Sequence, residues 1–153
     1  MDEVAAAAGV GVGTLYRHFP TKTDLLHALY AERLAEFAAK AERYVSDPPW
    51  DRLAALVSAM IEAQSTDLAL AEAPTCEVAD TRPELATVRI AFQRGLERLM
   101  AAAVASGDLR PDITQRDIVT LCFNRHLVGN PGGWQTYASI VLAGLRAPTT
   151  QEL

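Results

Sequence analysis

Apolar side chains recur every three or four positions along most of the chain, which is the period of an amphipathic α-helix. The clearest stripe runs through Leu53, Leu56, Val57, Met60 and Ile61. Similar stripes predict helices over about 21–45, 83–104, 114–127 and 134–145. No stretch alternates apolar and polar residues in the way that a half-buried strand does. The pattern therefore predicts an all-α fold.

Polar residues, prolines and a glycine interrupt these stripes at the positions where we expect helices to begin or end. A threonine followed three residues later by an acidic residue predicts a capping box, in which each side chain binds the other's backbone N–H. Asp47 and the two prolines after it should stop one helix and start the next, and Gly107 should close the helix before it. The predicted capping boxes are Thr21 with Asp24, Thr81 with Glu84, and Thr114 with Asp117.

A different arrangement of signals occupies the first thirty residues. Gly9 follows an alanine-rich helical segment and can take a positive φ, so it should end that helix. Residues 12–19 can form two turns, with Leu15 and Phe19 on the same face. Pro20 should end this helix because the residue before a proline avoids the α conformation. Two short helices across a glycine-containing turn form the layout of a DNA-reading helix-turn-helix.

These residues resemble the DNA-binding part of TetR-family transcriptional regulators. The resemblance rests on Val4 to Val10, then Thr14 to Phe19, then Lys22 with Leu25 and Leu26. The segments around 108–114 and 133–146 are similar to one C-terminal subgroup of that family. The resemblance implies a partial helix-turn-helix lobe over 1–30 and a helical effector-binding and dimerisation domain over 31–153.

The resemblance also implies DNA contacts on the second short helix. Thr14, Tyr16, His18 and Lys22 would touch phosphates or sugars, the last with help from the positive end of its own helix. Arg17 has the best chemistry for reading a base, since a guanidinium binds guanine bidentately. Many members carry a polar residue where this chain has Val12, which could instead meet a thymine methyl group.

The family has a complete helix before this motif, and Met1 aligns just inside the family's second helix. We therefore expect the lobe to be loosely packed, with weak specific DNA binding for these 153 residues. The charge also favours weak DNA binding. Residues 1–45 carry five Lys or Arg and six Asp or Glu, and the whole chain has a net charge of −5. Phosphate contacts dominate DNA affinity, so both half-sites of a dimer would be needed.

Ligand and partner sites are predicted less directly, from the stripes and the family layout. Gln64 ends its apolar stripe, either as an edge that meets water or as a polar contact inside a ligand cavity. The effector would be small and largely apolar, and the last two helices would pair with a second copy as a four-helix interface. The predicted pocket residues are Met60, Gln64, Cys76, Phe92 and Leu99; the predicted dimer residues are Ile118, Leu121, Cys122, Arg125, Trp134, Tyr137, Val141 and Leu145.

Other kinds of chemistry leave no pattern in the sequence. No nucleophile–base grouping, phosphate loop or carboxylate dyad is present, so we predict no enzyme and no cofactor. Cys122 and His126 form too sparse a pair for a metal, and Cys76 and Cys122 lack the spacing of a zinc site or a disulfide framework. No apolar run reaches 18 residues and no secretion signal is visible, which with the free cysteines favours the cytoplasm.

We therefore predict a homodimeric TetR-type regulator, most simply a repressor of a palindromic operator, that is released from DNA by a small molecule. The alternative is a dimeric helical ligand-binding module that has lost DNA binding, which the absent first helix favours. An enzyme is the weakest of the three hypotheses.

Overall fold

The computed structural model describes residues 1–43, 47–67, 83–123 and 132–148, and in these ranges the regular structure is helical. An isolated bridge between Leu109 and Arg146 is the sole β-type pairing there. The all-α prediction is confirmed. The helices are α1 (Asp2–Ala8), α2 (Val12–His18), α3 (Lys22–Glu42), α4 (Pro49–Thr66), α6 (Pro83–Ala105), α7 (Gln115–Cys122) and α8 (Trp134–Leu145).

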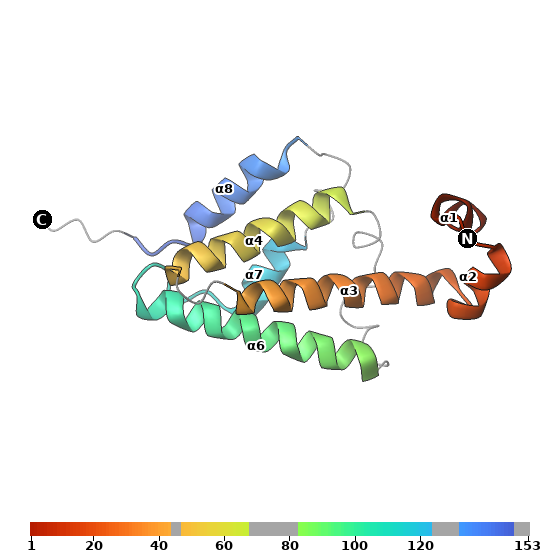
Figure 1. Cartoon of the computed structure of the whole chain (residues 1–153). Coiled ribbons are helices and arrows are strands. Elements are labelled where there is room, and N and C mark those ends of the chain that lie inside the picture. Colours follow the sequence, from red (N-terminus) through yellow and green to blue (C-terminus); the bar gives the residue numbers. More distant parts are fainter. Residues whose placement is uncertain (44–46, 68–82, 124–131, 149–153) are drawn as a thin grey trace, which may run out of the picture.

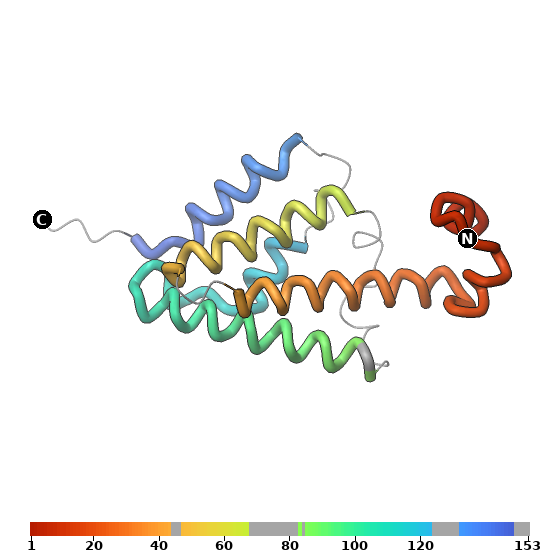
Figure 2. The backbone as a smooth tube through the Cα atoms, viewed as in Figure 1, coloured from red at the N-terminus to blue at the C-terminus, as the bar shows by residue number. Residues whose placement is uncertain are grey.

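The molecule consists of a small lobe and a helical bundle joined by one long helix. In Figure 1, α1 and α2 lie at one end, and α3 runs from them into a bundle of α4, α6, α7 and α8. The tube in Figure 2 shows α6 running alongside the bundle half of α3. At 21 residues, α3 is roughly 30 Å long, so it spans both parts.

Local signals in the sequence set several helix ends. Capping boxes are present at Thr21 with Asp24 and at Thr114 with Asp117, as predicted. Gly9 ends α1 with a φ of 67°, which a residue with a Cβ rarely adopts. The start of α4 differs from prediction: its N-cap is Pro48 rather than Asp47, and no side chain caps it. The predicted capping box at Thr81 and residues 124–127 of the helix predicted over 114–127 lie outside the described residues.

The core lies between α3, α4, α6, α7 and α8. The predicted stripe on α4 is confirmed, because Leu53, Leu56, Val57, Met60 and Ile61 are all completely buried. Each such side chain stabilises the fold by about 1.5–3 kcal/mol relative to exposure. On the other side of the core, the rings of Phe37 and Phe92 meet at 6.2 Å between centroids, which joins α3 to α6.

The close approach of α3 and α6 depends on a glycine. A Cβ placed on Gly95 of α6 would lie 2.9 Å from the Cβ of Ala41 on α3. Two tetrahedral carbons do not approach this closely, so only glycine fits there. Among the described helices, α3 and α6 also form the most extensive packing.

The far end of the bundle is closed by the segment between α6 and α7. Leu109 pairs with Arg146, and the N–H of Arg110 donates to the carbonyl of Leu145 at 3.1 Å. The Arg146 guanidinium lies 4.6 Å from the centroid of the Trp50 ring, a cation–π contact. Together these contacts tie the end of α8 to the start of α4.

Cys122 belongs to this core. It is completely buried near the end of α7, and its thiol lies 4.0 Å from the carbonyl oxygen of Val57. Burial raises the pKa of the Cys122 thiol to about 12, because the thiolate would lose its solvation. The thiol is therefore neutral and shielded, which rules out a reactive role for it in the folded chain.

We predict that Gly95→Ala destabilises the fold by about 1–3 kcal/mol, because the added methyl group forces α3 and α6 apart. Urea unfolding followed by circular dichroism measures the change. Gly144→Ala on α8 is the matched control, since nothing lies within 4 Å of its added Cβ. Removing the opposing methyl group in Gly95→Ala/Ala41→Gly should recover much of the loss; a stabilised Gly95→Ala variant would contradict the assigned close approach.

We predict that Cys122 reacts with a disulfide reagent about 1,000-fold more slowly in the folded chain than in urea, because its thiolate is suppressed. The reaction is measured in the Cys76→Ser variant, in which Cys122 is the one remaining cysteine. Since the folded pKa of about 12 exceeds the unfolded value of 9.0, the unfolded state loses its proton first as pH rises. Stability should therefore fall between these two values. Equal labelling with and without urea would contradict the burial.

Candidate nucleic-acid interface and ligand cavities

The lobe presents one polar helix face to solvent. Helices α1 and α2 contact each other, with Ala5 and Leu15 as their buried residues, and the rest of α2 is exposed or half-buried. Of the six residues predicted to meet DNA, Thr14 is half-buried and the others are exposed: Val12, Tyr16, Arg17, His18 and Lys22.

Arg17 is held in place within this face. Its guanidinium donates to the Thr14 hydroxyl at 3.0 Å, one helical turn away. The bond orients the arginine along α2 while leaving its other donors for a ligand. Lys22 is the first residue of α3, where the capping box uses the Asp24 carboxylate internally and the helix dipole is positive. Arg17 and His18 thus end α2, and Lys22 begins α3 after three intervening residues.

A cavity of about 340 Å³ lies at the junction of lobe and bundle. It is lined by residues of the α2–α3 turn, by the first turns of α3 and by Leu85 of α6. His27 on its wall is 5 % exposed, and neither ring nitrogen has a hydrogen-bond partner in the described part of the chain. Its burial at the junction is a finding of the tertiary structure.

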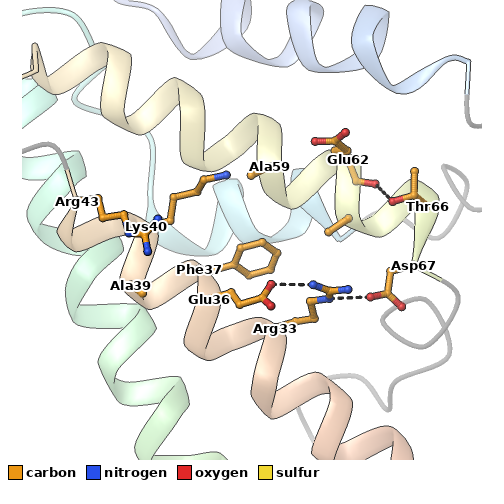
Figure 3. A pocket seen from close by; sticks show the side chains of 11 residues that line it. Arg33, Glu36, Phe37, Ala39, Lys40, Arg43, Ala59, Glu62, Thr66 and Asp67 are labelled. Atoms are coloured by element: carbon orange, nitrogen blue, oxygen red, sulfur yellow. Dashed lines mark hydrogen bonds and ion pairs between the residues drawn. The ribbon is translucent and has the colours of Figure 1, made fainter. Parts of the chain in front are cut away.

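A second cavity, about 430 Å³, is an open groove between α3 and α4 (Figure 3). Its floor includes Phe37, and its walls carry three cationic and three acidic side chains. Arg33 donates to Glu36 at 2.7 Å and to Asp67 at 2.8 Å, so it ties α3 to the residue that ends α4. These bonds raise the pKa of Arg33, with Glu36 the larger cause. The cationic and acidic residues are Arg33, Lys40, Arg43, Glu36, Glu62 and Asp67.

A third cavity, which we call the three-helix cavity, has a volume of about 350 Å³ and lies between α3, α6 and α7. Three aromatic residues and two aliphatic ones contribute to its lining, and its polar residues include two arginines. Sequence analysis found only Phe92 among them. The lining residues are Tyr30, Leu34, Arg89, Phe92, Gln93, Gln115, Arg116, Val119, Thr120 and Phe123.

The predicted pocket residues do not line one described cavity. Met60 and Leu99 pack within the core, while Phe92 borders the three-helix cavity. Gln64 is only 3 % exposed, so it does not mark an edge that meets water. Its side-chain oxygen finds no hydrogen-bond partner within the described ranges, whereas buried amides normally have one. Cys76 lies outside the described residues.

The predicted dimer residues divide into two groups. Ile118, Cys122, Val141 and Leu145 are buried in the chain's own core, so they cannot form a surface for a second copy. This corrects their assignment: the apolar stripe faces α4 instead. Leu121, Trp134 and Tyr137 are half-buried, and the Tyr137 hydroxyl donates to the Leu121 carbonyl at 2.8 Å. Arg125 lies outside the described residues.

The same helix has an exposed face that the stripe did not reveal. Ile140 is 65 % exposed, more than any other large apolar side chain recorded as exposed in the described ranges. Thr136 and Ala143, at one turn before and one turn after it, are exposed as well. A solvent-facing isoleucine between small neighbours is the only sequence signal that could have indicated this face.

Two absences apply to the described residues. No group of three His, Cys, Asp or Glu side chains is placed to hold a metal ion there. Nor does any helix among them combine the length and apolar character needed to cross a bilayer.

Known proteins share both parts of this architecture. The repressor KstR of Mycobacterium tuberculosis is 30 % identical over 114 residues, which is 73 % of this chain and 52 % of that protein. The chain spans about half the length of that relative. Among solved structures, the TetR transcriptional regulator SCO0520 of Streptomyces coelicolor aligns with a TM-score of 0.63 at 30 % identity. That alignment covers 97 % of this chain and 87 % of that one.

A second solved structure has a similar fold. The TetR transcription regulatory protein of Mycobacterium vanbaalenii aligns with a TM-score of 0.60 at 28 % identity, over 95 % of this chain and 82 % of that one. The family described as bacterial regulatory proteins of the tetR family matches residues 1–29. The C-terminal domain described as SbtR-like transcriptional regulator matches residues 48–147. The chain therefore belongs to the TetR family of bacterial regulatory proteins.

Proposed function

We propose that this chain works as a dimeric DNA-binding transcriptional repressor, and that a small molecule releases it from its operator DNA. The observation that carries the proposal is the exposed face of α2, where Tyr16, Arg17 and His18 lie beside Lys22 on a lobe that projects from the bundle. The family match over this same segment supports it. Such a role places the protein in the bacterial cytoplasm, where the DNA is.

Each residue of this face has a distinct role in the proposal. Arg17, held by Thr14, reads a guanine edge in the major groove. Tyr16 and His18 contact the backbone, and Lys22 meets a phosphate at the positive end of α3. Val12 is 40 % exposed and lies against a thymine methyl group. With so few cations, one lobe binds weakly, and two lobes on a palindrome supply the affinity.

Control by a small molecule works through α3 in this proposal. The helix carries Lys22 at one end and packs against α6 and α4 at the other. A ligand that changes this packing tilts α3 and moves α2 out of register with the major groove, provided that it binds the two arrangements with different affinity. Gln64, buried with an unsatisfied oxygen, remains a proposed polar contact for such a ligand.

The dimer in this proposal uses the exposed side of α8 together with α7. Thr136, Ile140 and Ala143 recur at i, i+4 and i+7, so they form one face. Half-buried Leu121 on α7, whose carbonyl accepts from the Tyr137 hydroxyl of α8, joins this face in the proposal. A two-fold axis through this face would form a four-helix interface of small and apolar side chains.

We predict that Arg17→Ala weakens binding to an operator selected from a random palindromic library by about 1–3 kcal/mol, or roughly 5- to 150-fold in Kd, since one guanine contact is lost. Fluorescence anisotropy at fixed salt measures this. Arg94→Ala, which removes the same charge from an exposed position on α6, should have no effect. If no operator is enriched, or if both variants bind like the parent, the assignment of α2 to base reading is overturned.

We predict that Ile140→Glu shifts the protein from dimer to monomer, with at least about tenfold weaker association, because a carboxylate would be buried at the two-fold interface. Sedimentation velocity over a concentration series measures this. Ile90→Glu on α6 is the matched control, since that isoleucine is also exposed but lies away from α8. A dimer that persists in Ile140→Glu and dissociates in Ile90→Glu would move the interface to α6.

A further inference from the structure

Helix α6 has an exposed face that combines apolar and charged side chains. Ile90 is 46 % exposed and Val104 is 39 % exposed, and these are the two large apolar side chains of α6 that reach solvent to this extent. Arg94, Glu97 and Ala101 lie between them along the helix and are exposed as well. In Figure 1, α6 lies at the side of the bundle opposite α8, so this face is separate from the proposed dimer contact.

These five residues form one stripe along α6. From Ile90 the others follow at i+4, i+7, i+11 and i+14, and this alternating spacing keeps side chains in line along a helix. Thr87, which is also exposed, continues the stripe, and its hydroxyl is satisfied by the carbonyl of Pro83 at 3.3 Å. From Thr87 to Val104 the stripe rises by roughly 25 Å. Two helices pair along such a seam in a coiled coil.

The stripe is complementary to itself when its direction is reversed. Its midpoint lies between Arg94 and Glu97, and the side chains on the two sides are equally spaced from that point. An antiparallel second copy would therefore bring opposite charges together in two symmetric central layers, flanked by apolar or small side chains. A two-fold axis produces such reciprocal contacts, whereas a parallel copy would bring like charges together. The layers are Thr87 with Val104, Ile90 with Ala101, and Arg94 with Glu97.

The two central charges are available for this contact. Within the described residues, Arg94 and Glu97 form no ion pair, whereas the neighbouring Arg98 is paired with Glu42 of α3. An exposed ion pair supplies little affinity, but complementary charges fix the register and orientation of two partners. The apolar layers would supply the affinity, because pairing removes their side chains from water.

We propose that α6 pairs antiparallel with α6 of a second copy, with Arg94 of each copy against Glu97 of the other and Ile90 against Ala101. Each copy contributes six side chains, fewer than the roughly 20–30 residues on each side of a stable interface. The contact is therefore weak, with a Kd on the order of 10–100 µM. At the lower concentrations of the operator and α8 dimer measurements it does not form, so Arg94→Ala and Ile90→Glu remain controls there.

The consequence of this contact rests on the proposed function. The N-terminal end of α6 lies next to the DNA-reading lobe, since Leu85 shares the junction cavity with His18 and Phe19. An antiparallel α6 pair therefore places the lobes of the two chains at opposite ends of the assembly. Two dimers joined in this way bind operators on two separate DNA segments and hold the segments together.

The test is a charge-reversal cycle, followed by sedimentation velocity up to about 500 µM protein. We expect the parent to form tetramers from dimers. Arg94→Glu or Glu97→Arg alone should weaken this step by at least about tenfold, because like charges then face each other. Arg94→Glu/Glu97→Arg restores opposite charges in both central layers, so its Kd should return to within about threefold of the parent's. Lys40→Glu and Glu32→Arg, which reverse exposed charges on α3, should leave the Kd unchanged.

A further variant keeps the result decisive. Val104→Glu places a carboxylate in an apolar layer and should abolish the tetramer. Circular dichroism checks that each variant is folded, and if a charge-reversal variant does not fold, Val104→Glu decides the result. The proposal is overturned if the parent forms nothing larger than a dimer, if single reversals or Val104→Glu associate like the parent, or if the double reversal fails to restore association.

The Ile140→Glu variant separates this contact from the proposed α8 dimer. Both contacts are upheld if Ile140→Glu is monomeric at low concentration and forms dimers at high concentration that Glu97→Arg abolishes. If the parent stops at a dimer that Ile140→Glu dissociates, the α8 contact is upheld and the α6 contact is overturned. If charge reversal on α6 dissociates the dimer and Ile140→Glu does not, the α6 contact is upheld and the α8 contact is overturned.

Bridging of DNA is measured with one biotinylated and one fluorescent operator duplex. Beads that hold the biotinylated duplex should retain the fluorescent duplex through the parent protein, and Glu97→Arg should reduce this retention by at least about tenfold. Tetramers that bind operator without bridging uphold the α6 contact and overturn its role on DNA. If no operator is bound, the DNA-reading function is overturned while the sedimentation result still decides the α6 contact.

Discussion

The contact between α3 and α6 is the constraint on which the rest of the structure depends. Gly95 allows the two helices to approach so closely that an added methyl group would meet Ala41 at 2.9 Å. The contact also brings Phe37 against Phe92 and fixes the bundle half of α3. Because an α-helix transmits a tilt along its whole length, the position of α2 beyond the bundle follows from this packing.

Two of the described cavities border α3. One lies between α3 and α4, and the other lies between α3, α6 and α7. The cavity between α3 and α4 is lined by cationic and acidic side chains, and Arg33 of α3 donates a hydrogen bond to Asp67 at the end of α4. The cavity between α3, α6 and α7 combines apolar side chains with polar ones, including Arg89 and Arg116. One long helix therefore borders two cavities of different character and also begins, at Lys22, next to the end of α2.

Sequence reasoning located the elements with strong local causes. Capping boxes at Thr21 and Thr114, the left-handed Gly9 and the stripe on α4 each depend on residues a few positions apart, and each was found where predicted. It was less informative where an apolar stripe could serve two purposes. Ile118, Cys122, Val141 and Leu145 have the spacing of an interface, but one chain's own α4 already covers them. A period of 3.6 indicates that a face is buried and cannot indicate by what.

The sequence by itself determined the helical class, the helix-turn-helix order of the first thirty residues and the identity of the residues that α2 exposes, because hydrogen bonding and capping within a helix are local. Only the tertiary structure decided which charges share a cavity. Arg89 and Arg116 are separated by 27 positions, and Arg33 and Asp67 by 34. Their proximity arises from helix packing, which depends on how side chains of distant segments fit together, so no local pattern encodes it.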